Sequence, residues 1–584
     1  MAEPTDDIIR AHGLGRQFRG RWAVKDVDLT VGRGEIVGLV GPDGAGKTTL
    51  LQLIAAILDP SAGRCTVLGF DSVRESAKIT SRIGYMAQGF TLYDRLTVAE
   101  NIAFAAKARN VSAAQLAARR QQLLAMAGLG PFLHRREGAL SGGMRKKLAL
   151  CANLVHEPPL LLLDEPGLGV DPLSRRELWR MLEAYRRQGA TIVFSTSYMD
   201  EAELCDRVAF LDAGGIVALG TPAELRARGD GAAFRVVTDD PAAVEGALSG
   251  EPDVLGVQWQ ARDVRFVMWP GREPSSSLRA PFRDLGRVES ASPTIEDVFV
   301  ILTAECNHSG DGDVESPSPA HTRGPMEGTQ AQISSQGLTR RFGSFVAVDD
   351  VYLDLGSGEI FGLLGANGAG KTTLIRMLCG LLSPSSGAAW VAGIDAVADP
   401  QRLRQRIGYM SQRFSLYPDL SVGENLSFFA SAYGLDRKAA REAIGWARAV
   451  TGLARFEHHT VARLSGAVRQ RLGLACAILH RPAVVFLDEP TSGVDPLSRF
   501  RFWRLVNALG AAGTTVLVTT HYLEEAAYCH RLGLMHEGRL IAAGDLASLR
   551  AELPADVPQT VEAVFIAHIE RARTRMPQSE SSAS

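Results

Sequence analysis

Residues 41–49 read GPDGAGKTT, and residues 365–373 read GANGAGKTT. Both segments fit the pattern G-x-x-x-x-G-K-[ST]. The first lies between a strand-like segment, GEIVGLV at 34–40, and an apolar helix-like segment, LLQLIAAIL at 50–58. In this motif the glycines let backbone N–H groups surround phosphate, and the helix N-terminus adds partial positive charge. Two matches in the same context exclude coincidence, so the sequence predicts two phosphate-binding loops.

The two loops belong to an internal repeat. The offset of 324 residues between them also relates Phe18 to Phe342, Gln88 to Gln412 and Ser141 to Ser465, and about 200 residues align without a net insertion. Beyond the aligned region the first half carries 58 extra residues, between about 221 and 292. In that region FRVVT, VLGVQWQ and VRFVMW predict short strands around a helical AAVEGALS. We therefore expect two similar domains and a small α/β subdomain appended to the first.

Each loop offers the groups that a nucleoside triphosphate requires. Lys47 and Lys371 can reach the β- and γ-phosphates, and Thr48 and Thr372 can ligate Mg²⁺. The predicted binding residues of the loops are Gly41, Gly44, Gly46, Lys47, Thr48 and Thr49, and Gly365, Gly368, Gly370, Lys371, Thr372 and Thr373.

A pair of carboxylates follows an apolar strand in both halves, in LLLLDEP at 160–166 and VVFLDEP at 484–490. Asp164 and Asp488 are predicted to hold the Mg²⁺ shell, and Glu165 and Glu489 to polarise the attacking water. The alternative is a strand that ends in a solvated acidic turn. A phosphate loop upstream in both halves favours the catalytic interpretation.

LSGGM at 140–144, with LSGAV at 464–468, completes a series of motifs. The order phosphate loop, Gln88, LSGG, LLLLDEP and GVDP resembles the ATP-binding cassette (ABC) family over nearly the whole chain. Two cassettes in one chain, with the tails SPTIEDVF and PQTVEAVF, are similar to the ATP-binding subunits of ABC-2-type efflux transporters. In that family the signature motif of one cassette closes on nucleotide bound to the other.

The resemblance assigns further residues. The signature residues Ser141, Gly142, Gly143, Ser465 and Gly466 would contact the nucleotide of the opposite cassette, where amides at a helix N-terminus suit an anion. Gln88 and Gln412 match the glutamine that links Mg²⁺ to the membrane partner, and Asp171 and Asp495 match the D-loop aspartate. Phe18 and Phe342 match the aromatic residue that stacks on adenine; the alternatives are a core phenylalanine, with Trp22 as another stacking residue.

The predicted fold class is α/β: two P-loop NTPase cassettes in one chain, each with a helical subdomain, folded head to tail, plus the small accessory subdomain. We assign cassette 1 to 1–220, the accessory subdomain to 221–304, a flexible Ser/Gly/Pro-rich linker to 305–332, cassette 2 to 333–550, and a tail to 551–584. The end of the tail, MPQSESSAS, is predicted to be frayed.

Two departures from the family pattern coincide. The family histidine that contacts the γ-phosphate is present as His521, but Ser197 stands in its place in the first half. Ala467 replaces the second signature glycine, Gly143, and we expect its methyl group to intrude where backbone approaches phosphate. Both defects would fall on the site at Lys47. Loss of one group that stabilises the transition state costs about 10²- to 10³-fold in rate, so ATP turnover is predicted mainly at the second loop. The alternative is that both sites are active.

The function implied by the resemblance is an ATP-hydrolysing subunit that uses ATP and Mg²⁺ and docks on two ABC-2-type permease subunits. A periplasmic adaptor is a further possible partner in such a complex. GFTLYDRLTVAEN and RFSLYPDLSVGEN resemble the permease-facing region; the alternative is that they only cover the helical subdomain. A translation factor is the other candidate, but residues 221–332 carry 10 Arg, no Lys and 18 acidic residues, a charge of −8 that repels nucleic acid. A sugar-importer subunit is a third.

Composition sets the remaining expectations. The apolar fraction is 46% and the net charge is −2, which gives no global reason to bind nucleic acid. We see no apolar run long enough to span a bilayer and no leader in MAEPTDDIIR, which predicts a cytosolic chain at the inner face of the membrane. The 7 scattered cysteines form no CxxC pair, which argues against disulfides and a metal cluster.

Overall fold

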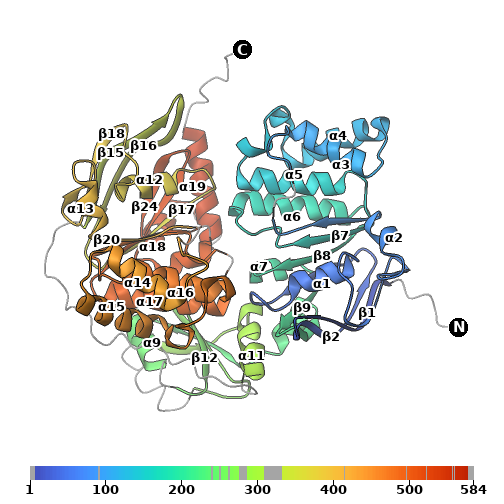
Figure 1. Cartoon of the computed structure of the whole chain (residues 1–584), viewed down its shortest axis with the longest axis horizontal. Coiled ribbons are helices and arrows are strands. Elements are labelled where there is room, and N and C mark those ends of the chain that lie inside the picture. The colour runs from blue at the N-terminus through green and yellow to red at the C-terminus, as the bar shows by residue number, and fades with distance from the viewer. Residues whose placement is uncertain are drawn as a thin grey trace.

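The computed structural model shows two similar lobes, with a smaller sheet beneath one of them (Figure 1). The described residues are 7–89, 92–238, 241–248, 251–260, 263–274, 286–307, 332–412, 415–492, 494, 496–520, 522–554, 557 and 560–575. The predicted residues Asp495 and His521 and most of the predicted linker lie outside these ranges, as does 576–584.

In cassette 1 a six-stranded sheet in the order β10-β9-β3-β8-β7-β6 forms the centre of the described structure. All residues of β7 are buried because both faces of this largely parallel sheet are covered, which is why LLLL is not interrupted by polar residues. Its strands are β3 (Ile36–Val40), β6 (Ile83–Met86), β7 (Leu160–Asp164), β8 (Thr191–Thr196), β9 (Arg207–Asp212) and β10 (Gly215–Gly220).

An antiparallel sheet in the order β2-β1-β4-β5 packs over the first phosphate loop. Its strands are β1 (Asp7–Phe18), β2 (Arg21–Gly32), β4 (Ala62–Val67) and β5 (Phe70–Asp71). The helices that accompany the two sheets are α1 (Lys47–Ile54), α2 (Ser76–Thr80), α6 (Pro172–Arg186), α7 (Met199–Ala202) and α8 (Pro222–Ala227).

A helical subdomain carries the first signature motif. It contains α3 (Val98–Ala108), α4 (Ala113–Ala127), η1 (Gly130–Phe132), η2 (Glu137–Ala139) and α5 (Gly142–Leu154). α3 begins with a capping box in which Thr97 and Glu100 satisfy each other's backbone N–H groups, and α4 ends at Gly128 in the left-handed conformation. Sequence-local signals thus define where these helices start and stop.

Cassette 2 repeats this arrangement, with sheets in the orders β16-β15-β18-β19 and β20-β21-β22-β17-β23-β24. Its strands are β15 (Ile333–Phe342), β16 (Phe345–Leu355), β17 (Ile360–Gly365), β18 (Ser386–Val391), β19 (Ile394–Asp395), β20 (Ile407–Met410), β21 (Val484–Asp488), β22 (Thr515–Thr520), β23 (Arg531–His536) and β24 (Arg539–Gly544). Its helices are α12 (Lys371–Leu378), α13 (Pro400–Arg404), α14 (Val422–Ala432), α15 (Arg437–Thr451), η3 (Ala454–Phe456), η4 (Val461–Arg463), α16 (Gly466–Ile478), α17 (Pro496–Ala511), η5 (Leu523–Tyr528), α18 (Leu546–Ala551) and α19 (Val561–Arg575).

The accessory subdomain is an antiparallel sheet in the order β12-β13-β11-β14 with α9 on one face. Its elements are β11 (Ala233–Val237), α9 (Pro241–Leu248), β12 (Val254–Gln260), β13 (Asp263–Met268), β14 (Arg287–Ser290) and α11 (Ile295–Asn307). The predicted strands and helix are present, whereas the short polar β14 gave no apolar signal in the sequence. α11 continues into the range predicted as linker.

The range predicted as the C-terminal tail contains α19, which packs on the second cassette through buried Val564, Phe565 and Ile569. α11, the counterpart of α19, packs on the first cassette through Val298, Phe299 and Leu302. Each cassette is therefore closed by a helix that contains its VF pair. Among the described residues, no helix is both long and apolar enough to cross a bilayer.

Candidate functional site

The two phosphate loops have the same internal geometry. Lys47 Nζ donates to the carbonyl oxygens of Gly41 at 2.7 Å and Pro42 at 3.3 Å, and Lys371 Nζ donates to those of Gly365 at 2.6 Å and Ala366 at 3.1 Å. These bonds bend each lysine back over its loop. Gly46 and Gly370 have φ of 98° and 103°, a left-handed conformation that glycine adopts without strain. Each loop is thus a preformed cradle at a helix N-terminus.

Oxygen donors for a hard cation lie beside both loops. Thr48 Oγ1 donates to Asp164 Oδ1 at 3.0 Å, and Ser195 Oγ donates to the same oxygen at 2.6 Å. In cassette 2 the corresponding bonds run from Thr372 at 3.1 Å and Thr519 at 2.7 Å to Asp488 Oδ1. A hydroxyl and a carboxylate next to a phosphate cradle are the ligand types that suit Mg²⁺.

Glu165 and Glu489 follow these aspartates with φ of 49° each, so both carboxylates turn out of their strands. Their partners differ between the two cassettes. Glu165 Oε1 lies 3.3 Å from Lys47 Nζ, and its Oε2 accepts from Ser197 Oγ at 3.3 Å. Glu489 Oε2 accepts from Gln412 Nε2 at 2.7 Å, and the Glu489 carboxylate also acts electrostatically on Lys371.

Burial shifts the charges of these groups. Desolvation lowers the pKa of Lys371, partly opposed by the Glu489 carboxylate, and desolvation raises the pKa of Asp488. In cassette 1, desolvation also lowers the pKa of Lys146, whose Nζ donates to the carbonyl oxygens of Gln88 at 3.1 Å and Glu165 at 3.3 Å. The position equivalent to Lys146 is Gln470, so a buried cation sits beside the first site but not at the same place in the second.

The cassettes face each other head to tail. Asn367 of the second loop donates through Nδ2 to the carbonyl oxygen of Gly169 at 2.7 Å, and a Cβ at Gly142 would lie 3.5 Å from the same nitrogen. On the other side, a Cβ at Gly466 would lie 2.6 Å from Asp43 Oδ2 of the first loop. Each loop therefore lies opposite the signature motif of the other cassette.

Ser141 and Ser465 are the N-caps of the signature helices α5 and α16, where their Oγ atoms accept from Met144 N at 3.3 Å and Val468 N at 3.4 Å. A Cβ at Gly143 would overlap Ser174 in the same cassette. The space in front of Gly143 is therefore occupied by its own cassette. The expected effect of the methyl group of Ala467 stays a prediction.

The remaining predicted residues lie around the loops. Phe18 and Phe342 are 44% and 47% exposed, so neither is a core residue, and Trp22 is also exposed. Asp171 is buried as the N-cap of α6, and its charge acts on Lys371 across the cassette interface. No role is visible for Asp495 and His521, which lie outside the described residues. The nucleotide-contacting and catalytic roles of the predicted residues stay predictions.

Sequence reasoning missed a contact at the centre of the molecule. Tyr198 and Tyr522 occupy equivalent positions in the repeat and stack on each other with ring centroids 5.0 Å apart. Arg175 lies over the ring of Tyr198 at 4.6 Å and Arg499 over the ring of Tyr522 at 4.0 Å. Both tyrosines directly follow the positions of Ser197 and His521, a spacing that could have drawn attention to them.

Two phosphate cradles, each paired with a buried Asp-Glu dipeptide and an opposing signature helix, define a tandem P-loop ATPase. The family model described as "ABC transporter" matches residues 24–167 and 348–492, and a model described as an AAA domain matches 464–525. The chain belongs to the family of ABC transporter ATP-binding proteins.

Known proteins are similar to the whole chain and to parts of it. The chain is 42% identical over 573 residues to "Probable multidrug ABC transporter ATP-binding protein YbhF" of Escherichia coli (strain K12), which covers 96% of this chain and 98% of that protein. It is 33% identical to "Daunorubicin resistance ATP-binding protein DrrA3" of Streptomyces coeruleorubidus over 52% of this chain and 97% of that protein. A solved "Structure of ATP binding subunit of ABC transporter" covers 38% of this chain and 92% of its own, with 30% identity and a TM-score of 0.36.

Proposed function

We propose that the chain is the ATP-hydrolysing, energy-coupling subunit of an ABC-2-type exporter in which the second phosphate loop carries the main hydrolytic site. The names of the relatives support export, since they include a multidrug transporter subunit, a daunorubicin resistance protein and "Nod factor export ATP-binding protein I" of Burkholderia pseudomallei (strain K96243). The transported molecule is bound by the permeases in this scheme, so its chemistry is not set by this chain.

The side chain beside the first glutamate is the observation that carries the asymmetry. Glu489 accepts from Gln412 and also acts electrostatically on Lys371, and the sequence offers His521 to orient a water molecule beside it. Glu165 is paired with Lys47, and Ser197 replaces the histidine that the family places there. A neutral hydroxyl cannot stabilise charge on the γ-phosphate as a cationic imidazole can, which supports hydrolysis at Lys371 over hydrolysis at Lys47.

Each site requires Mg²⁺, which would be held by Thr48 and Asp164, or by Thr372 and Asp488, with Gln88 and Gln412 as further predicted ligands. The metal would neutralise charge on the β- and γ-phosphates. ATP would then join the two cassettes, because each loop lies opposite the N-capped signature helix of the other cassette and phosphate would be held between them. Closure and reopening shift the populations of two conformations according to which nucleotide is bound.

Exposed aromatic pairs support docking of the chain on two permeases. Tyr93 and Phe104 are 51% and 48% exposed and meet edge to face, with ring centroids 4.7 Å apart. Tyr417 and Phe428 repeat this pair in cassette 2 at 4.6 Å. Tyr93 and Tyr417 lie on the stretches that resemble the permease-facing region, and Phe104 and Phe428 follow three residues after these stretches end. Exposed aromatic pairs at equivalent positions fit two membrane subunits related by the same pseudo-symmetry, at the cytoplasmic face of the inner membrane.

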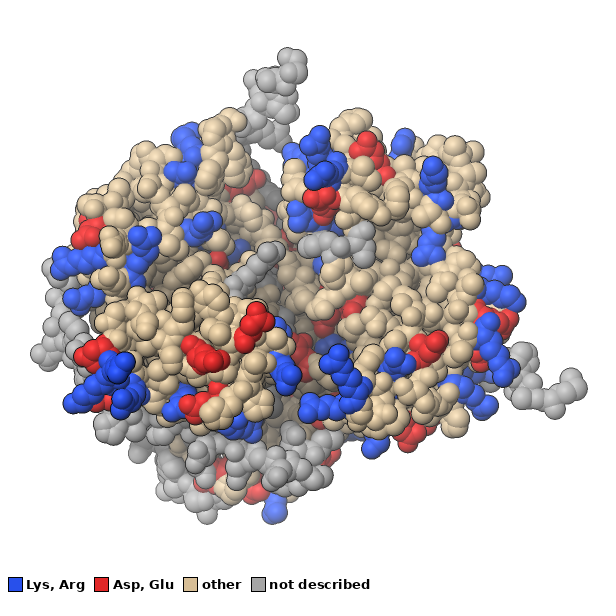
Figure 2. Space-filling model, in the orientation of Figure 1, with Lys and Arg blue, Asp and Glu red and all other residues tan. Residues whose placement is uncertain are grey.

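The mixed surface charge gives no support to the translation-factor alternative. In Figure 2 basic and acidic side chains are interspersed over the face shown, and the surface is recessed between the two cassettes. A nucleic-acid-binding surface needs a continuous basic patch.

Two substitutions test the proposed hydrolytic asymmetry. Glu489→Gln is expected to remove most ATP hydrolysis by the purified chain, whereas Glu165→Gln is expected to remove much less, while both variants still bind ATP. Equal losses would contradict the assignment of a main site. Purification of the tagged chain from gently solubilised membranes tests the partners: two polytopic subunits are expected, and ribosomal proteins without a permease would overturn the transporter function.

A further inference from the structure

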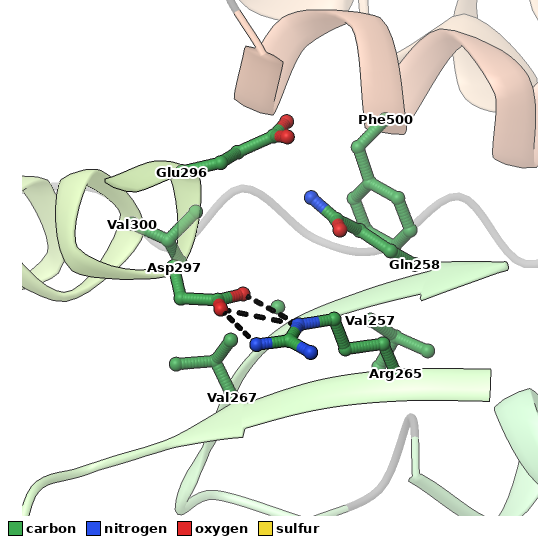
Figure 3. A pocket seen from close by; sticks show the side chains of 9 residues that line it. Val257, Gln258, Arg265, Val267, Glu296, Asp297, Val300 and Phe500 are labelled. Carbon is green, nitrogen blue, oxygen red and sulfur yellow. Dashed lines mark hydrogen bonds and ion pairs between the residues drawn. The ribbon is translucent and has the colours of Figure 1, made fainter. Parts of the chain in front are cut away.

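The accessory subdomain of the first cassette reaches across to the second cassette. Phe500, on the first turns of α17, packs against the hydrophobic core of the accessory sheet, next to Phe266 and Val257. Figure 3 shows its ring directed from α17 toward the accessory sheet, beside Gln258 of β12. The cavity that remains beside the ring is about 20 Å³, close to the space that one water molecule requires.

Polar contacts frame this apolar anchor. Arg504, one turn after Phe500 on α17, places Nε 2.8 Å from Glu245 Oε1 of α9. The two side chains are 28% and 14% exposed, so this ion pair is partly withdrawn from water and stronger than a surface pair. On the far side of the slot, Arg265 of β13 binds Asp297 at the start of α11, with Nε 3.2 and 3.1 Å from the two carboxylate oxygens (Figure 3).

α17 and η5 pack against each other and against the accessory sheet. Trp503 of α17 stacks on Tyr528 of η5, with ring centroids 5.1 Å apart and an interplanar angle of 13°. β12 packs on both elements. Burial, and after it the carboxylate of Glu296 in α11, raises the pKa of the Tyr528 phenol, which places η5 beside the accessory subdomain.

These two elements lead directly from residues that are predicted to act at the ATP sites. α17 begins at Pro496, immediately after Asp495, and η5 begins at Leu523, two residues after His521. A contact that holds both elements is therefore close in sequence to these two predicted residues.

The first cassette provides an internal comparison, because the same surface is not covered there. At the offset of the repeat, Phe500 corresponds to Arg176, Arg504 to Arg180, and Tyr528 to Leu204. Leu204 is 57% exposed, and the residues around it line an open cavity of about 520 Å³. Among the described residues, Glu562 of α19 in cassette 2 approaches this surface, with its Oε1 3.8 Å from Arg176 Nε.

We infer that the accessory subdomain is a one-sided clamp that positions α17 and η5 of cassette 2, with Phe500 and Arg504 as its positioning residues, and thereby supports hydrolysis at the second ATP site. The inference rests on the proposed function in its assignment of the second site. The clamp gives the extra residues of the first cassette a role: they contact α17 and η5 of cassette 2 through β12.

Two disruptive variants and two controls test the clamp in the full chain. Phe500→Arg introduces the residue found at the equivalent position 176, and Arg504→Glu reverses the charge that faces Glu245. Arg504→Lys keeps the positive charge, and Arg180→Glu makes the matched reversal on the uncovered surface of cassette 1. We expect both disruptive variants to lower kcat for ATP by about tenfold with little change in KM, because misplaced catalytic groups cost rate. The two controls are expected to stay within about twofold of the original rate.

Hydrogen exchange supplies a readout that does not depend on turnover. In Phe500→Arg and Arg504→Glu, amides of η5 at 523–528 should exchange faster, while those of the equivalent segment 199–204 keep their rates. If exchange at 523–528 is unchanged, the accessory subdomain does not hold η5 and the clamp is refuted.

Glu489→Gln, measured in parallel, separates the clamp from the function on which it rests. Wild-type kcat in both disruptive variants, with hydrolysis lost in Glu489→Gln, refutes the clamp and leaves the second site standing. A second outcome is faster exchange at 523–528 in the disruptive variants together with retained hydrolysis in Glu489→Gln. This outcome refutes the assignment of the second site and the catalytic role of the clamp, and shows only that the accessory subdomain contacts η5. A loss of kcat and faster exchange in both variants, with both controls unaffected, supports the clamp.

Discussion

Glu165 and Glu489 both have a left-handed backbone conformation, which is unfavourable for residues other than glycine. Their φ of 49° lies in the left-handed region, where a non-glycine residue costs about 1–3 kcal/mol. The cost is offset by a hydroxyl on the next strand. Ser195 Oγ and Thr519 Oγ1 each accept from the backbone N–H of the glutamate at 2.9 Å and donate to the preceding aspartate at 2.6 and 2.7 Å. One hydroxyl thus links the backbone of the glutamate to the carboxylate of the aspartate.

Removal of that hydroxyl should uncouple the two carboxylates. Thr519→Val keeps the shape of the side chain but loses both bonds, so we expect the hydrolysis rate to fall by about 10²-fold, the cost of one misplaced stabilising group. Steady-state ATP turnover measures the effect, and Ser195→Ala makes the matching deletion in cassette 1. A smaller loss in Ser195→Ala is expected. Equal losses would mean that both sites turn over.

The charge of Asp488 has a stability cost that pH should reveal. Desolvation raises the pKa of this carboxyl above its ordinary value, so the folded protein holds the proton more tightly than the unfolded chain and its stability falls as pH rises through the raised pKa. Asp488→Asn removes the buried charge. We expect the metal-free variant to melt at a higher temperature than the original protein at pH 7.5.

The difference between the two melting temperatures should shrink as the pH falls toward the ordinary range of aspartate, because Asp488 is then neutral in both states. Addition of Mg²⁺ and ATP is expected to raise the melting temperature of the original protein and to raise that of Asp488→Asn much less. A variant less stable than the original at pH 7.5 without metal would show that the hydrogen bonds to Thr372 and Thr519 outweigh the cost of desolvation.

Among the secondary-structure elements, those with local signals were predictable and those held by distant contacts were not. The phosphate loops, the acidic strand ends and the N-capped signature helices follow from residue types at fixed spacing. Nothing local marks Lys146, which reaches Gln88 and Glu165 only because α5 crosses the end of β7. Likewise, nothing local shows that a Cβ at Gly143 would meet Ser174 of α6, which is distant in sequence.

The stacked tyrosines join α7 of one cassette to η5 of the other. Because each ring is nearly completely buried and capped by an arginine, removal of either should weaken the association of the cassettes. We expect Tyr198→Ala and Tyr522→Ala to be non-additive, with a coupling energy of about 1 kcal/mol, as for other aromatic pairs. Chemical denaturation of the ATP-bound chain in a Glu489→Gln background measures it. Strict additivity would show that the stack carries no energy of its own.

At the scale of the whole molecule, the repeat and its family resemblance led to the expectation of head-to-tail cassettes, but the sequence could not show how the accessory subdomain is placed. A repeat with a pseudo-twofold arrangement brings equivalent residues together at its centre, as it does Tyr198 and Tyr522. The accessory sheet has no counterpart in the second half, so symmetry says nothing about it. Its position rests on Phe500 and on the pair of Arg504 with Glu245, three residues outside every motif.

The head-to-tail arrangement makes one further prediction about closure. Asn367 Nδ2 donates to the carbonyl oxygen of Gly169 at 2.7 Å, a hydrogen bond between the second loop and the D-loop region of cassette 1. Asn367→Ala should weaken the closed form by about 1 kcal/mol, the usual net value of such a bond, and so raise the ATP concentration needed for half-maximal turnover by about fivefold. Turnover as a function of ATP concentration measures this shift.

Asp43 is the equivalent residue of the first loop and faces Gly466. Asp43→Ala should change the ATP concentration for half-maximal turnover less, since the second site dominates turnover. A larger shift in Asp43→Ala than in Asn367→Ala would place the closure that limits turnover at the first loop.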